Sequence, residues 1–199
     1  MTKFVAPPFD FPQVAYSRLE TPWSLRPLLF KGGAQTEVRR VETMISTGLL
    51  GPLREERLPL IQLFYEIFDA DIAGGCSRHS IGTRIKVLRR FYSWVDQIDA
   101  SPTVANVQDL YIEWTEALLE RQREQHELKS KTVYMSANIV AILLSRALDL
   151  PTSPRLSTRV KRNSTGRQES NVDGSKQNLH LTTIFGHALL VTCSPRLVR

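Results

Sequence analysis

The sequence predicts an all-α protein, a bundle of four to five helices, on three observations. Apolar residues recur every three or four positions in several stretches, most clearly in residues 77–96. Gly and Pro turns, such as Gly74-Gly75, separate these stretches. No two stretches alternate apolar and polar residues as paired strands do. An extended N-terminal arm and a basic, largely irregular C-terminal tail are expected to flank the bundle.

Three regions are expected along the chain. Residues 1–34 form the arm, in which five prolines are mixed with six aromatic residues. The arm is too apolar for a solvated linker, so its aromatic side chains are expected to pack on another surface. Residues 35–150 hold the helices. Residues 151–199 contain few apolar residues and many Ser, Thr, Asn, Arg and Lys, as linkers and tails do.

The first two helices are predicted from apolar spacing and end signals. The first is expected to start after a cap at Thr36, and its apolar side consists of Val38, Val41, Ile45 and Leu49. The second is expected over residues 58–73, because Pro59 suits a first turn and the glycine pair after it stops a helix.

The third helix, over residues 77–96, carries an apolar stripe and a basic face. Ser77 or Ser80 can cap its start. Basic side chains are expected opposite the stripe: Lys86, Arg89 and Arg90.

Two more helices complete the bundle. The fourth begins at Asn106, which can accept hydrogen bonds from the first turn, with Asp109 three residues later. The fifth covers residues 131–148 and is apolar on most sides, so it is expected at the centre of the bundle.

Composition predicts a cytoplasmic protein without a membrane partner. In its 199 residues, of which 42% are hydrophobic, no run of about 18 apolar residues occurs, and the first residues lack the apolar core of a secretory signal. Cys76 and Cys193 lie far apart and match no metal spacing, so free thiols in a reducing compartment are expected.

The net charge of +6 arises entirely in the last 45 residues, which hold eight Lys or Arg and two Asp or Glu. A basic tail on a neutral body indicates an anionic partner, most often nucleic acid, although a solubilising tail has the same composition. The tail residues expected to contact DNA are Arg159, Lys161 and Arg162.

Metal and catalytic motifs are absent from the sequence. Of the four histidines, His180 and His187 are seven residues apart, without carboxylate or cysteine neighbours at ligand spacing. The sequence contains no G-x-S-x-G elbow and no phosphate-binding G-x-x-x-x-G-K-[ST] loop. No metal, cofactor or small-molecule substrate is therefore expected.

Basic and hydroxyl side chains gather at the starts of two predicted helices. A helix N-terminus already favours an anion through its backbone amides and its dipole. A solvated charged face is the competing interpretation. The candidate contacts are Arg78, His79, Thr83, Arg84, Lys86 and Arg90 on the third helix, and Lys129, Lys131 and Thr132 at the fifth.

Three stretches resemble the core-binding domain of tyrosine recombinases, the phage-integrase class. HSIGTRIKVLRRFYSWV resembles the helix that opens this domain, with Leu88 and Phe91 as its Leu-x-x-Phe pair and Trp94 near its end. NVQDLYIEWTEALLE resembles the next helix, and SKTVYMSANIVAILLSRALDLP the last helix before the catalytic domain. The resemblance covers roughly residues 55–150.

The resemblance implies a SAM-like bundle whose partner is double-stranded DNA, gripped mainly through phosphates by the residues named above at the two helix starts. Other recombinase protomers are a further partner that it implies. It also implies a role in DNA recombination or integration.

The chain departs from this family in its catalytic residues. It has no His-x-x-Arg, and its five tyrosines all lie at or before the last predicted helix. Residues 151–199 look like a linker and the truncated start of a catalytic domain, so the chain is not expected to be an enzyme. The alternatives are a helical interaction protein whose aromatic arm docks on a partner, and a non-functional remnant that still folds.

Overall fold

The computed structural model describes residues 9–151 except 19, 21 and 125–127. Helices dominate this part of the chain, and its only β-type pairing consists of two isolated bridges, Asp10 with Ser24 and Phe30 with Leu53. The predicted all-α class is therefore confirmed. The elements are the short 3₁₀-helices η1 (Arg26–Leu29), η2 (Gly33–Gln35), η3 (Val38–Arg40) and η4 (Glu55–Arg57), and the α-helices α1 (Val41–Ser46), α2 (Leu58–Ala73), α3 (Arg78–Gln97), α4 (Val107–Glu124) and α5 (Ser130–Ala147).

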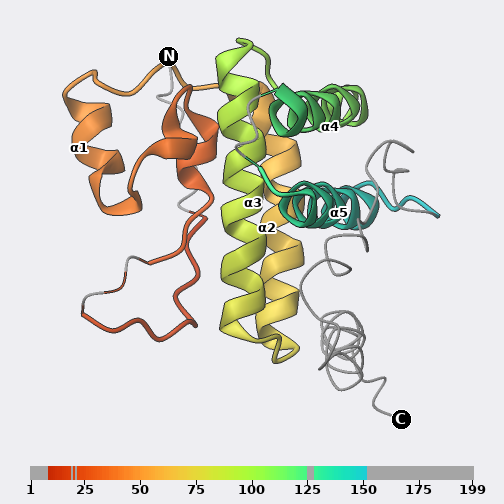
Figure 1. The fold of residues 1–199 in the computed structure, drawn as a ribbon. Helices are drawn as coiled ribbons and strands as arrows, with labels where there is room; N and C mark the ends of the chain where they lie inside the picture. Colours follow the sequence, from red (N-terminus) through yellow and green to blue (C-terminus); the bar gives the residue numbers. More distant parts are fainter. Residues whose placement is uncertain (1–8, 19, 21, 125–127, 152–199) are drawn as a thin grey trace, which may run out of the picture.

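The helices form layers around the hairpin of α2 and α3, which stands at the centre of Figure 1. The N-terminal segment with η1, η2 and α1 lies on one side of this hairpin. Helices α4 and α5 lie on the other side and cross the hairpin steeply. Helix α5 contacts α2, α3 and α4, as its extensive apolar surface predicted, but the centre of the bundle is the hairpin and not α5.

The hairpin follows its local sequence signals closely. Pro59 occupies the first turn of α2, where its missing N–H costs no hydrogen bond. Gly75 has a φ of 77°, which reverses the chain after α2. The Ser77 hydroxyl accepts the Ser80 amide at 3.3 Å and caps α3. The predicted bounds of both helices hold to within a residue or two.

The first predicted helix is shorter than its apolar spacing suggested. Val38 belongs to a 3₁₀ turn, and Thr36 ends η2 instead of capping a helix. Gly48, with a φ of 67°, turns the chain before Leu49, and Leu49 is 73% exposed. The prediction that Leu49 continues the apolar side is therefore wrong.

Helix α4 is capped one turn earlier than predicted. The Thr103 hydroxyl accepts the Asn106 amide at 3.3 Å, and the Asn106 side chain accepts the Thr103 amide at 2.8 Å. This reciprocal pair is a capping box, with Thr103 as the N-cap and Asn106 three residues inside.

The described part of the N-terminal arm, from residue 9, is built into the core. Phe9 and Phe11 are buried, and the Phe11 ring stacks on Tyr65 of α2 with 5.0 Å between centroids. The chain then folds into η1 and η2 with Leu28 and Leu29 fully covered. The aromatic side chains thus pack as expected, but on the chain's own helices, and two 3₁₀ turns replace the expected extended conformation.

The buried guanidinium of Arg57 ties these layers together. This residue is 0% exposed and donates to the Leu28 carbonyl at 3.1 Å, the Ala100 carbonyl at 2.9 Å and the Asp96 carboxylate at 2.7 Å. Asp96 also accepts the Gly32 amide at 2.8 Å. One arginine therefore connects the N-terminal segment, the start of α2 and the end of α3.

Two further expectations concern the membrane and the thiols. None of the helices that the structure describes is long and apolar enough to cross a membrane.

Cys76 is disulfide-bonded, so the expectation of a free thiol there is wrong. Cys193 lies outside the described residues.

Candidate nucleic-acid interface

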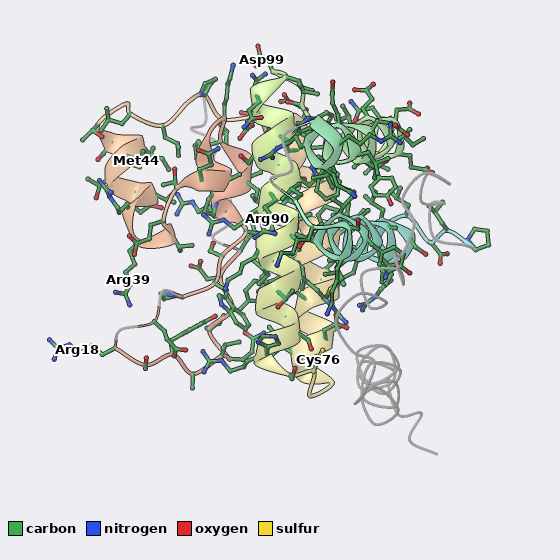
Figure 2. The ribbon with its side chains drawn as sticks, viewed as in Figure 1. Arg18, Arg39, Met44, Cys76, Arg90 and Asp99 are labelled. Atoms are coloured by element: carbon green, nitrogen blue, oxygen red, sulfur yellow. The ribbon has the colours of Figure 1, made fainter. Side chains whose placement is uncertain are left out.

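Four of the six predicted contact residues on α3 share one face of the helix. They are His79, Thr83, Lys86 and Arg90, here called the basic stripe, and they follow the four-three-four spacing of a single helical face. His79, Lys86 and Arg90 are exposed and Thr83 is half-buried. Arg90 lies midway along α3 in Figure 2. The apolar residues of α3 face the opposite way, into the core.

The basic stripe contains no carboxylate that would neutralise it. The one acidic residue of α3 is Asp96, which Arg57 and the Gly32 amide hold at the edge of the core. Neither Lys86 nor Arg90 forms a hydrogen bond or ion pair within the described part of the chain. Both cations are therefore available to an external anion.

Arg78 is engaged by the N-terminal segment. Its guanidinium lies 5.4 Å from the Tyr16 ring centroid and 5.7 Å from that of Trp23, and its Nη2 is 3.4 Å from both carboxylate oxygens of Glu20. The pKa of Glu20 is lowered, first by the Ser17 amide and also by Arg78. The structure separates Arg78 from the basic stripe and uses it to attach the segment to α3.

Arg84 also differs from its predicted role. Its guanidinium donates to the buried carboxylate of Asp71 on α2 at 2.6 Å, and Arg146 of α5 donates to the same oxygen at 2.8 Å. This triad connects α2, α3 and α5. Because the Arg84 side chain is mostly buried against this carboxylate, it lies outside the basic stripe, and the charge that the triad keeps is shared with Arg146.

Arg89, predicted on the exposed basic face, is half-buried against η2. It donates to the carbonyls of Ala34, at 2.9 Å, and Thr36. Burial lowers its pKa below the usual value. Sequence spacing placed Arg89 beside Arg90, but a rotation of one residue along a helix separates a packed face from an exposed one.

The second predicted cluster lies at the start of α5. Lys129 is the residue before the helix, Lys131 is in its first turn, and both are exposed, with Thr132 half-buried. Gln122 of α4 donates to the Ser130 hydroxyl at 2.7 Å, which fixes this start against the last turn of α4. Among the described residues no hydrogen bond or ion pair joins this cluster to the basic stripe.

The predicted contact residues of the tail lie outside the described residues: Arg159, Lys161 and Arg162. Gln97 is exposed one helical repeat beyond Arg90 and extends the stripe toward the end of α3. Sequence reasoning missed it, although its seven-residue spacing from Arg90 was the available signal.

The tyrosines of α3 and α4 are core residues. Tyr92 and Tyr111 are fully buried, and burial raises the pKa of each phenol above its usual value. The Tyr111 hydroxyl donates to the Ala137 carbonyl at 3.1 Å. In the described part of the chain, no group of three or more His, Cys, Asp or Glu side chains could hold a metal ion.

Comparison with known proteins finds no relative. No protein-family model matches the chain, and no significant match occurs among curated proteins or solved structures.

Proposed function

We propose that this chain binds double-stranded DNA through the basic stripe of α3, as a helical module like the SAM-like, core-binding half of a tyrosine recombinase. The observation that carries the proposal is the stripe itself, a row of exposed cationic and hydroxyl side chains along one helix with no carboxylate in it. Such a row supplies the phosphate contacts that dominate non-specific DNA affinity.

The surface of the described residues favours a duplex over a single strand. Proteins that bind single strands without sequence preference stack bases on aromatic side chains. The large apolar side chains exposed here are all aliphatic: Leu49, Ile98, Val104, Ile112 and Met135. A row of cations without a stacking platform suits a continuous phosphate backbone.

The proposed role is to hold DNA during recombination or integration, without cleaving it. Strand cleavage by this enzyme class needs an exposed phenolic nucleophile beside Arg and His donors. Tyr92 and Tyr111 are fully buried, and the guanidinium over the Tyr92 ring, that of Arg57 at 5.5 Å, is itself buried and bonded to Asp96. Neither phenol is therefore exposed to a DNA phosphate.

The rival proposal, an interaction protein with a docking arm, loses its main support. Of the described aromatic residues of the arm, Phe9, Phe11 and Phe30 are covered by the chain's own core, and Tyr16 and Trp23 are half-buried. The three phenylalanines are therefore not available to a partner.

The test is duplex binding at low salt, measured by fluorescence anisotropy over a salt series. Lys86→Ala with Arg90→Ala removes two phosphate contacts. We expect weaker binding to every duplex sequence, and a log–log salt slope that is shallower by about 1.8, at about 0.9 per phosphate.

The matched control is Arg18→Ala with Arg40→Ala, which removes the same charge from exposed positions outside the stripe. Figure 2 shows Arg18 far from Arg90. The control should leave the slope within experimental error of the unmodified chain. Equal losses in the two double variants would contradict the proposal, because a general charge effect would then explain binding.

A further inference from the structure

Helix α4 carries an acidic stripe on its outer face. Its members are Asp109, Glu113, Glu116 and Glu120, of which Asp109, Glu113 and Glu120 are exposed and Glu116 is half-buried. Apolar residues of α4, including Val107, Tyr111 and Trp114, face the core instead. The stripe borders a shallow hollow that also includes Ile112, which is 54% exposed, and Arg123.

The acidic stripe matches the basic stripe residue for residue. Both follow the same four-three-four spacing, from 79 to 90 on α3 and from 109 to 120 on α4. Laid side by side in opposite directions, the two helices would oppose Lys86 to Glu113 and Arg90 to Asp109. His79 would then meet Glu120, and Thr83 would meet Glu116. Every position of this antiparallel register places a donor or a cation against a carboxylate.

The two stripes cannot meet within one molecule. The middle of α4 is bound to the core through Trp114, whose ring lies 5.4 Å from that of Phe91 on α3, and through Tyr111, which donates to α5. The core-facing side of α4 is thus fixed, and its acidic stripe points away from α3. Among the described residues, Asp109, Glu113 and Glu120 therefore face no part of the basic stripe of their own molecule, and a second copy of the chain can supply it.

We propose that the acidic stripe of α4 docks on the basic stripe of α3 of a second copy of this chain. The contact joins two different surfaces, so each copy can present one stripe and receive the other. This contact consists mainly of exposed ion pairs, and the association is therefore weak and sensitive to salt. Ile112 adds an apolar contact beside the charges.

The proposal goes beyond DNA binding, and one surface links the two. DNA and the second copy compete for Lys86 and Arg90. Duplex DNA should therefore dissociate the assembled protein, and the protein should self-associate only when DNA is absent.

The test is sedimentation of the full chain without DNA, at low salt and up to about 1 mM protein, the range in which weak contacts populate. One variant reverses the basic stripe with Lys86→Glu and Arg90→Glu. The other reverses the acidic stripe with Asp109→Lys and Glu113→Lys. Circular dichroism confirms that both variants remain helical. Arg18→Glu with Arg40→Glu is the control for charge change elsewhere.

We expect the unmodified chain and the control to self-associate, and each reversed variant to remain monomeric. An equimolar mixture of the two reversed variants should associate again, because both kinds of pairing are then complementary. A monomeric unmodified chain, or a mixture that stays monomeric, would overturn the proposal. So would a concentration-independent compaction, which would indicate that the chain's own basic tail occupies α4. These readouts contain no DNA, so their failure leaves the DNA-binding proposal standing, and the reverse also holds.

Discussion

Two buried tyrosines, Tyr92 and Tyr111, differ in whether their hydroxyl group forms a hydrogen bond. The Tyr92 hydroxyl has no hydrogen-bond partner in the part of the chain that the structure describes, whereas the Tyr111 hydroxyl donates to Ala137. A buried polar group without a partner loses its hydration and gains nothing in return. The two phenols therefore contribute differently, although both rings are fully packed.

Replacement of each phenol by phenylalanine should separate these contributions. Tyr111→Phe removes a made hydrogen bond, and we expect it to lower the free energy of unfolding by about 1 kcal/mol. Tyr92→Phe should leave that free energy unchanged or raise it. Urea denaturation followed by circular dichroism measures both. Equal losses would show that the Tyr92 hydroxyl has a partner, such as a buried water.

The same phenols predict alkaline sensitivity. Burial raises the folded-state pKa of both, so folding holds each proton beyond the pH at which the unfolded chain releases it. The contribution of each neutral phenol is complete below about pH 10 and decreases as pH rises above that value. We expect the urea midpoint to fall from there upward, and to fall less steeply in the Tyr92→Phe variant. A midpoint that stays constant above pH 10 would contradict this.

Sequence reasoning located the basic residues of α3 but not their partners. Arg84 finds Asp71 and Arg78 finds Glu20, thirteen and fifty-eight residues away. Periodicity along one helix identifies a face, but it carries no information about which distant segment covers that face. Lys86 and Arg90 are exposed, as the spacing predicted, because no segment of the described residues covers them.

Helix ends are the features of this fold that local chemistry decides best. Helices α2 and α3 were predicted to within a residue or two, because Pro59, Ser77 and the glycine pair act within one turn. The prediction for α1 failed because four apolar residues in register do not outweigh a glycine with positive φ and a single buried side chain, Val41. The cap of α4 was misassigned by three residues because both Thr103 and Asn106 are strong N-cap types.

The capping box of α4 offers an element-scale prediction. Thr103→Ala removes the acceptor for the Asn106 amide, and we expect a loss of about 1 kcal/mol in the free energy of unfolding. Asn106→Ala breaks the same reciprocal pair. The double variant should therefore lose less than the sum of the two single losses, as chemical denaturation would show. Strict additivity would mean that the two side chains act separately.

At the scale of the molecule, Arg57 makes the N-terminal segment and the helices one cooperative unit. Arg57→Leu would leave the nearly buried carboxylate of Asp96 without its cation, and we expect a loss of about 3–5 kcal/mol. Arg57→Leu with Asp96→Asn should recover part of that loss, because the buried charge is gone. Calorimetry would check both variants. A smaller loss in the single variant than in the double one would refute the ion-pair account.

The layered arrangement was only partly visible in the sequence. The number of helices follows from the periodic apolar stretches, and the packing of α5 on three other helices follows from its extensive apolar surface. The inclusion of residues from Phe9 onward in the core depends on contacts more than fifty residues apart, such as Phe11 with Tyr65. Aromatic content indicated that the arm packs on something, but not on what.

The contacts of α5 with three other helices have a consequence for synthesis in the cell. A ribosome makes the chain from its N-terminus, so α2, α3 and α4 emerge before the helix that all three contact. Until residue 147 has emerged, the apolar side chains that α5 will cover on these helices stay exposed to solvent. Such exposed surface binds chaperones or aggregates. Completion of this core depends on α5, the last of the described helices to be translated, and a chain that stalls before it would be a substrate for degradation.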